Sequence, residues 1–306
     1  MILTQYHAAT EATERNFEGA AATLSRTPQF EATKNPHAYA TSQAIQVAFA
    51  VDQAQFGAAG ARLTQEQPRL DSGNVFHGVN DTMALSISQL LSPDLAGQKP
   101  RLKESISRAL AERKNVAHSL RNIIDTQILT LAYFAARAGE TEQGRSALAT
   151  LAKEKYAAYT IEHKLRIVAE AEILRATGDA DQAVRKLETL SQDGSEPVLA
   201  HLALLDAYAS AGQPVKAMAE SRWLAAHRGR AYAEYSPANL LTPFNVGLTT
   251  MALLRGAELA LEMQDTKSAT SGLESFLKAW PKAGENRSLA KRISSVQAGL
   301  PSEPAP

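Results

Sequence analysis

A short turn followed by the same helical pattern recurs along this chain of 306 residues. The clearest copies are AGETEQGRSALATL (138–151), TGDADQAVRKLETL (177–190) and AGQPVKAMAESRWL (211–224). In each copy a glycine ends one helix, a polar turn follows, and a small residue opens the next apolar stripe: Gly144, Ala183 or Ala217. A second version occupies 15–24 and 54–63. Repetition at a period of roughly 20–50 residues predicts a helical-repeat array in which each unit packs against its neighbours.

The turns divide the chain into helical hairpins. Apolar positions recur at helical spacing, alanine is abundant and β-branched residues rarely cluster, so the pattern predicts an all-α chain. We expect a stack of about seven helical hairpins, closed by a capping helix near 285–298. The expected hairpins cover approximately 1–28, 37–68, 80–115, 117–153, 160–191, 198–228 and 246–280. Breaks rich in Gly, Pro, Asp and Ser separate several of them, at 71–74, 92–100 and 191–197.

The regularity of the pattern differs along the chain. Residues 1–115 carry divergent hairpins, 116–300 carry the regular ones, and 301–306 form a tail that we expect to be disordered. Gly139, Gly178 and Gly212 are separated by 39 and 34 residues, whereas 52 residues separate Gly212 from Gln264, the matching position of the last hairpin. The excess predicts an inserted loop at 227–245. Long loops in compact domains are often functional.

These turns and helices resemble the tetratricopeptide repeat, a 34-residue helix–turn–helix unit. In that family a glycine begins the turn, an alanine follows five residues later, and large apolar residues occupy fixed helix positions. The matching residues here are Ala171, Leu174, Gly178 and Ala183; Tyr208, Gly212 and Ala217; Ala257, Ala269, Phe276 and Pro281, with Gln264 replacing the glycine; and Phe17, Ala20 and Leu24. The resemblance implies a right-handed superhelical stack, and a non-catalytic scaffold or adaptor that binds another protein or a peptide on its concave face.

In such a stack the first helix of each hairpin lines the concave face. The residues that fall there are Tyr133, Arg137, Glu172, Arg175, Asp206 and Glu258. Alternating charges with one aromatic ring suit an extended peptide or a partner helix. The same residues also suit a merely solvated helix face, and both interpretations remain open.

The inserted loop offers a second candidate site. Cations and aromatic residues gather in it and just before it: Arg222, Trp223, Arg228, Arg230, Tyr232 and Tyr235. Arginine beside aromatic rings suits an anion or a peptide carboxylate, which it grips with two parallel hydrogen bonds. A structural account also holds, in which the basic residues complement a helix C-terminus and the rings wedge two unequal hairpins together.

Composition and motifs argue against several classes of function. The chain has no cysteine, which excludes disulfides, thiolate metal sites and cysteine nucleophiles. Its 32 basic and 32 acidic residues balance, so no net field favours nucleic acid or an anionic membrane. The basic stretch 101–115 lacks interleaved aromatics and fits an amphipathic helix with a Glu104–Arg108 pair. Nucleotide, hydrolase, zinc-protease and EF-hand motifs are absent, so we expect no enzyme activity, cofactor or metal.

The chain also lacks targeting signals. Its first residues have neither a basic nor an apolar segment, and the most apolar run, 123–138, contains Asp125 and Arg137. We therefore expect a cytoplasmic protein with no membrane insertion. Two other functions stay open: a regulatory or sensor region of a larger bacterial signalling protein, and an enzyme that uses dispersed carboxylates such as Glu162 and Asp206.

Overall fold

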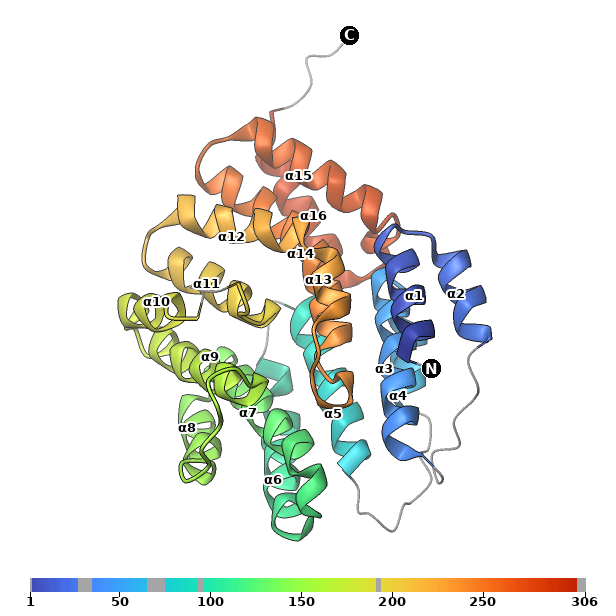
Figure 1. The fold of residues 1–306 in the computed structure, drawn as a ribbon. Coiled ribbons are helices and arrows are strands. Elements are labelled where there is room, and N and C mark those ends of the chain that lie inside the picture. The colour runs from blue at the N-terminus through green and yellow to red at the C-terminus, as the bar shows by residue number, and fades with distance from the viewer. Residues whose placement is uncertain (1, 27–34, 65–74, 93–95, 191–193, 302–306) are drawn as a thin grey trace.

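The computed structural model describes residues 2–26, 35–64, 75–92, 96–190 and 194–301. Within them the chain contains sixteen α-helices, four short 3-10 helices and no strand (Figure 1). The prediction of an all-α chain is confirmed. The breaks at 71–74 and 191–193 and the tail at 302–306 lie outside the described residues.

The α-helices follow one another in this order: α1 (Ile2–Thr13), α2 (Phe17–Ser25), α3 (Pro36–Asp52), α4 (Phe56–Thr64), α5 (Val75–Leu91), α6 (Lys99–Asn115), α7 (Arg121–Arg137), α8 (Thr141–Thr150), α9 (Ile161–Ala176), α10 (Ala180–Glu188), α11 (Val198–Ser210), α12 (Pro214–Ala226), α13 (Arg228–Ala233), α14 (Thr242–Glu262), α15 (Thr266–Ala279) and α16 (Arg287–Gly299). The 3-10 helices are Ala96–Gln98, His118–Leu120, Pro237–Asn239 and Ala283–Glu285.

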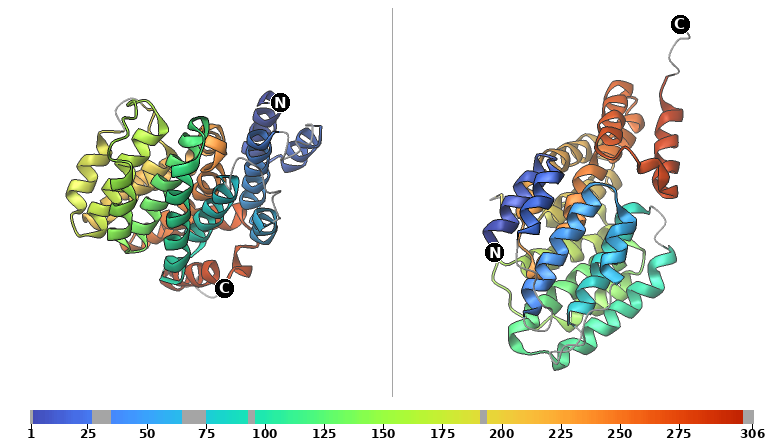
Figure 2. Two further views of the ribbon diagram at one scale, coloured as in Figure 1. Left: turned by 90° about the horizontal axis from the view of Figure 1, so that it is seen from below. Right: turned by 90° about the vertical axis from the view of Figure 1, so that its right-hand side faces the viewer.

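Helices that follow one another in sequence pack in pairs. The pairs are α1–α2, α3–α4, α5–α6, α7–α8, α9–α10, α11–α12 and α14–α15. The final helix, α16, contacts both α14 and α15 at the edge of the molecule (Figure 2). The basic stretch at 101–115 lies in α6 with Leu102 and Ile106 buried, and Arg108 donates to Glu104 at 2.8 Å, so the amphipathic interpretation is confirmed.

The paired helices do not form an open row. Contacts run from α5 through α7, α9, α11 and α12 to α14, and α14 returns to pack against α3 and α5. Every residue of α7 from Ile123 to Ala136 is buried. In Figure 1 this inner group lies between α1–α4 on one side and α8 and α10 on the other. The inner surface along α7 is therefore core, and the superhelical stack itself stays a prediction.

Six of the turns within these pairs share one backbone geometry. In each turn one residue has a positive φ, between 58° and 94°, and the next residue donates its N–H to the carbonyl oxygen five positions back. These hydrogen bonds measure 2.7–2.9 Å and are those of the Schellman helix-ending motif. The positive-φ residues are Arg15, Ala54, Gly139, Gly178, Gly212 and Gln264. Glycine occupies only three of the six turns, which is why the sequence repeat is weaker than the structural one.

A small buried residue follows each positive-φ residue by five positions. These residues are Ala20, Ala59, Gly144, Ala183, Ala217 and Ala269. Gly144 shows the reason, because a Cβ added there would lie 3.0 Å from the carbonyl oxygen of Ala132 in the preceding helix. The small residue therefore marks the point where the two helices of a pair approach most tightly.

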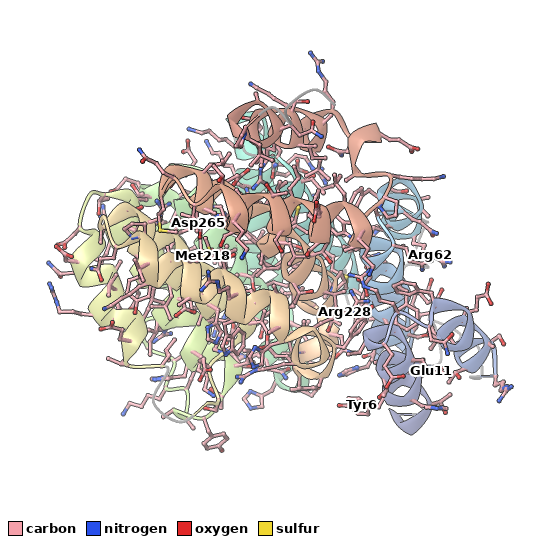
Figure 3. The ribbon with its side chains drawn as sticks, turned by 90° about the horizontal axis from the view of Figure 1, so that it is seen from above. Tyr6, Glu11, Arg62, Met218, Arg228 and Asp265 are labelled. Carbon is pink, nitrogen blue, oxygen red and sulfur yellow. The ribbon has the colours of Figure 1, made fainter. Side chains whose placement is uncertain are left out.

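The inserted segment differs from the expected loop. It contains α13, the 3-10 helix Pro237–Asn239 and the first turn of α14, which begins at Thr242 rather than near residue 246. Arg228 of α13 forms a two-pronged ion pair with the carboxylate of Asp52 at the end of α3. The same guanidinium donates to the carbonyl oxygens of Ala12 at 2.7 Å and Thr13 at 3.2 Å. The segment is thus held against α1 and α3, in the position that Figure 3 shows for Arg228.

The strained turn at Gln264 gives a first prediction. This exposed residue has a φ of 61°, a conformation that costs a side-chain-bearing residue about 1 kcal/mol. We expect Gln264→Gly to raise the free energy of unfolding, measured by urea denaturation, by up to about 1 kcal/mol. The matched variant is Gly178→Ala, where an added Cβ meets no atom within 4 Å, and it should lower the same quantity by a similar amount. A destabilising Gln264→Gly would contradict this account of the turns.

The Asp52–Arg228 pair gives a second prediction. Asp52→Ala leaves a guanidinium that is only 11% exposed without its partner, which should lower the free energy of unfolding by about 3–5 kcal/mol. The hydrogen bond from Trp280 Nε1 to Asp52, at 2.9 Å, goes to the backbone oxygen and remains available in the variant. Combining Asp52→Ala with Arg228→Met should recover part of the loss, because no charge is then left unpaired. A loss below about 1 kcal/mol in Asp52→Ala would show the pair to be no stronger than a surface one.

Candidate functional site

A cavity of about 880 Å³ lies at the N-terminal ends of three inner helices. It is lined by Arg121, Asn122 and Asp125 of α7, by Thr160, Ile161, Glu162 and Lys164 around the start of α9, and by Ser195 to Pro197 just before α11. The inserted segment contributes Arg230, Ala233, Glu234, Tyr235 and Pro237. The volume falls within the range of ligand sites, about 300–1,000 Å³.

Tyrosines stand at this cavity. Tyr159 and Tyr235 line it and are 83% and 60% exposed. Elsewhere in the described part of the chain, only Tyr6 and Val215 are large apolar residues with comparable exposure. Tyrosine is enriched in protein interfaces because its ring buries apolar area while its hydroxyl still forms hydrogen bonds. Two exposed rings beside one cavity therefore indicate a contact surface.

One side of the cavity holds two carboxylates that are already paired. Arg113 of α6 donates Nε to Asp125 Oδ1 at 2.6 Å and Nη2 to Glu154 Oε1 at 2.7 Å. Tyr156 donates its hydroxyl to Asp125 Oδ2 at 2.8 Å. Burial and this hydrogen bond raise the pKa of Tyr156, whereas the hydrogen bond from Arg113 lowers the pKa of Glu154. Both carboxylates are thus held by Arg113, and Asp125 has both of its oxygens engaged.

Glu234 crosses from the inserted segment to cap α11. The N–H of Val198, the first residue of α11, donates to Oε2 at 2.6 Å, and Asn245 Nδ2 donates to Oε1 at 2.7 Å. The residue before α11 is Pro197, which offers no side-chain cap. Burial raises the pKa of Glu234, although both hydrogen bonds act in the opposite direction. This carboxylate therefore fastens two walls of the cavity together.

Glu196 is only half satisfied. His201 Nε2 lies 3.1 Å from its Oε1, and the other ring nitrogen, Nδ1, lies 2.7 Å from Glu220 Oε2. A histidine ring donates to both carboxylates only when both of its nitrogens carry a proton. Glu196 is 5% exposed, and its Oε2 has no hydrogen-bond partner among the described residues.

A stack of rings supports this wall from behind. Trp223 lies between His201 and His227, with ring centroids 3.3 Å and 4.0 Å apart. The guanidinium of Arg230 lies 5.3 Å from the centroid of the Trp223 ring, and it donates to backbone carbonyls in the segment 194–196. Arg230 Nη1 also lies 3.7 Å from Glu196 Oε1, so its charge pairs with this carboxylate as well as holding the backbone of this segment.

Glu162 has no such partner. It lines the cavity from the first turn of α9 and is 8% exposed, yet it forms no hydrogen bond or ion pair within the described residues. Its neighbour Lys164, also largely buried, donates Nζ to Ser195 O at 2.6 Å and to Ser195 Oγ at 2.7 Å. The remaining cation of the lining, Arg121, is exposed at the start of α7. Among the buried charged side chains of this lining, Glu162 is thus the one for which the described residues supply no partner.

Five of the six residues expected on the inner face lie together, away from this cavity. Arg137 of α7 pairs with Asp206 of α11 at 3.0 Å, and Arg175 donates to both oxygens of Glu172 at 2.8 and 2.6 Å. Burial raises the pKa of Tyr133, whose hydroxyl has no hydrogen-bond partner in the described part of the chain. The charged side chains are no more than 22% exposed. They pair mainly with one another.

Glu258, the sixth of these residues, lies elsewhere. Its carboxylate accepts two hydrogen bonds from Arg292, at 2.7 and 2.9 Å. The pair joins α14 to α16 and has no contact with the cavity lining.

The residues expected in the loop site are dispersed. Arg230 and Tyr235 line the cavity, and Trp223 supports its wall. Arg228 and Tyr232 belong to the buried cluster on Asp52, where Tyr232 donates its hydroxyl to the carboxylate. The structure thus assigns part of the set to a cavity wall and part to the core.

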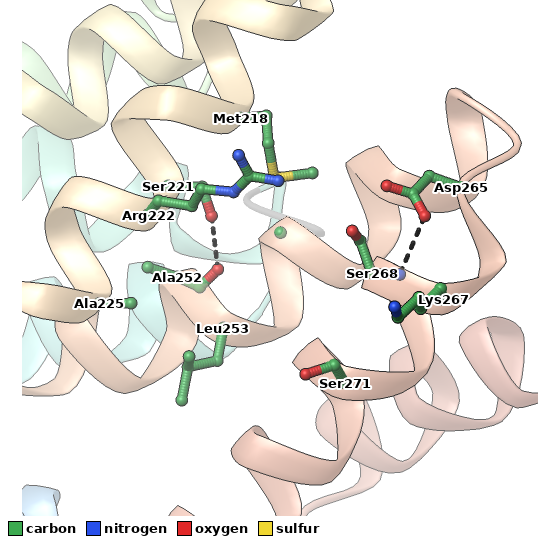
Figure 4. Close-up of a pocket in the computed structure, with 11 residues that line it drawn as sticks. Met218, Ser221, Arg222, Ala225, Ala252, Leu253, Asp265, Lys267, Ser268 and Ser271 are labelled. Atoms are coloured by element: carbon green, nitrogen blue, oxygen red, sulfur yellow. Dashed lines mark hydrogen bonds between the residues drawn. The ribbon is translucent and has the colours of Figure 1, made fainter.

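Arg222, the last of that set, faces a second hollow of about 460 Å³ between α12, α14 and α15 (Figure 4). Met218 lies beside it on α12, and Asp265 stands across the hollow at the start of α15. Asp265 accepts the N–H of Ser268 at 3.0 Å, and this helix cap lowers the pKa of its carboxyl. The placement of Asp265 is therefore explained by the helix that it caps.

The dispersed carboxylates do not meet. Glu162 lines the cavity, whereas Asp206 is paired with Arg137 outside it. Among the described residues, no three His, Asp or Glu side chains gather as they would around a metal ion. In the same part of the chain, no helix has the combination of length and apolar character that crossing a bilayer requires.

Sequence reasoning missed several cavity residues. Glu196 falls in the break at 191–197, which had been interpreted only as a turn. Tyr156 and Tyr159 fall between two expected hairpins, in the segment EKYAAYT. Two tyrosines in a connection, where small polar residues are usual, were a signal of this site.

No protein-family model, curated protein or solved structure matches the chain. Function is therefore inferred from the geometry of the cavity.

The raised pKa of Glu234 gives a third prediction. Because its folded pKa lies above the unfolded value near 4.5, its contribution to stability is complete below that value and is lost as pH rises through the folded pKa. The free energy of unfolding of the wild type, measured relative to Glu234→Gln, should therefore fall as the pH rises above the unfolded pKa of about 4.5. Glu274→Gln, exposed on α15, controls for the loss of one surface charge. If this difference in unfolding free energy rose with pH instead, it would show that folding lowers the pKa of Glu234, contrary to the prediction.

Proposed function

We propose that this protein is a non-catalytic scaffold that binds a segment of another protein or a peptide at the cavity between α7, α9, α11 and the inserted segment. The observation that carries the proposal is the pair of exposed tyrosines, Tyr159 and Tyr235, beside a cavity of about 880 Å³. They come from two different segments of the lining, the connection before α9 and the inserted segment. Aromatic contact area of this kind supplies much of the energy in protein interfaces.

The walls of the cavity are fixed before any partner arrives. Glu234 ties the inserted segment to α11, Arg230 holds the segment 194–196, and Arg113 holds Asp125. Binding to a site whose side chains are already placed loses little conformational entropy. This rigidity favours recognition over a catalytic role that needs movement.

The array behind the cavity is proposed to be a right-handed, tetratricopeptide-like solenoid in the cytoplasm. The shared geometry of six turns and the small residue five positions later support a repeat architecture. Such arrays present long, rigid surfaces to protein partners. In this chain we place the partner site at the helix N-termini rather than on the buried face of α7.

The rim tyrosines test the proposal and give a fourth prediction. Peptides selected from a random displayed library on the wild-type protein should bind the double variant Tyr159→Ser, Tyr235→Ser about tenfold or more weakly, because each ring contributes buried contact area. Affinities would be measured by fluorescence anisotropy. Tyr6→Ser is the matched control, since Tyr6 is exposed on α1 and does not line the cavity.

The contrary result is equally clear. If selected peptides bind the double variant and the Tyr6→Ser control with wild-type affinity, the cavity is not the partner site. Thermal unfolding of each variant checks that it remains folded, as we expect for substitutions of exposed side chains.

A further inference from the structure

Most of the charged side chains that line the cavity already have partners within the protein, but not all of them do. Asp125 and Glu154 are paired with Arg113, and Glu234 accepts from Val198 and Asn245. Lys164 and Arg230 donate to the protein's own backbone near residue 195. Two acceptors of the lining have no hydrogen-bond partner among the described residues: the carboxylate of Glu162, and Oε2 of Glu196, whose other oxygen faces His201 and Arg230.

An unpartnered buried carboxylate is costly. Glu162 is 8% exposed and Glu196 is 5% exposed, and both line the cavity. Buried charges in proteins are paired or hydrogen-bonded in nearly all cases, because desolvation without compensation is strongly unfavourable. A positively charged group that donates hydrogen bonds suits Glu162, and Oε2 of Glu196 offers a further acceptor in the same lining.

We propose that the cavity binds a basic side chain, lysine or arginine, of the partner segment, with its charged head on Glu162 and Glu196. This inference rests on the proposed function, and it specifies what the site recognises. Cation-to-carboxylate hydrogen bonds are roughly twice as strong as neutral ones. The cavity exceeds the volume of one such side chain, so residues that flank it in the partner reach the rim.

The aromatic lining fits the same ligand. A cation is attracted to the face of a tyrosine ring within about 6 Å of its centroid. Arg166 already lies 4.9 Å from the ring of Tyr156 in this wall, which leaves Tyr159 and Tyr235 as the exposed rings. The free carboxylates thus reverse the expectation, drawn from Arg228 and Arg230, that this region binds an anion.

A double-mutant cycle on selected peptides tests the inference. Peptides that depend on Tyr159 and Tyr235 should each contain a lysine or arginine whose replacement, arginine by citrulline or lysine by norleucine, lowers affinity about tenfold or more. Glu162→Gln keeps the shape of the side chain and removes its charge. In Glu162→Gln, replacing the basic residue of the peptide should cost little further affinity, because the interaction between the two residues is already lost. Glu274→Gln should leave the cost of the replacement unchanged.

The outcomes separate the inference from the function on which it rests. Peptides that depend on the tyrosines but tolerate the neutral replacement overturn the basic-residue inference and leave the scaffold function intact. A requirement for an acidic residue or a free C-terminal carboxylate overturns it as well. If no selected peptide depends on the tyrosines, the proposed function and the inference both fail. The effect of the peptide replacement is measured on the wild-type protein. It therefore tests the inference even if Glu162→Gln does not fold.

Discussion

The bidentate pair between Arg228 and Asp52 is the interaction on which the remaining arrangement depends. It joins residues 176 positions apart and brings α13 against the ends of α1 and α3. Once α13 is fixed there, the residues that follow it run past the N-termini of α9 and α11, and Glu234 reaches Val198. The cavity wall is therefore a consequence of a buried ion pair outside the cavity. An inserted segment without this anchor would have no fixed position opposite Glu162.

The regular part of the fold was predictable because its information is local. Gly178 and Ala183 encode a helix-ending turn and a tight crossing within six residues, and the same geometry recurs wherever that spacing does. The turns at Arg15, Ala54 and Gln264 have the same backbone but no glycine, so tertiary packing imposes a conformation that local preference disfavours. The helical hairpins were readable, whereas the return of α14 to α3 and α5 was not, since no local pattern specifies which distant helices meet.

The candidate site was only partly predictable for the same reason. The importance of the inserted segment followed from a break in the repeat period, and Arg230 and Tyr235 do line the cavity. The sequence alone could not show which arginines are free to bind a ligand, because Asp52, the partner of Arg228, lies in another part of the chain. Glu196 and Tyr159 come together with Glu162 only after three helices have aligned their N-termini. The local sequence indicated where the site lies, whereas long-range pairing determines which charged side chains of the cavity remain free for a ligand.

The placement of Glu162 has a physical origin in the architecture. Helix N-termini carry partial positive charge, which favours carboxylates in the first turn, and Glu162 occupies such a position in α9. The stabilisation is modest, about 0.3–1 kcal/mol at an exposed terminus, and it is smaller than the cost of leaving a carboxylate buried and unpaired. The helix ends therefore explain why acidic residues are tolerated around the cavity, but they do not satisfy Glu162. In the proposed complex, the basic group of the partner would give Glu162 the compensation that Arg113 gives to Asp125 and Glu154.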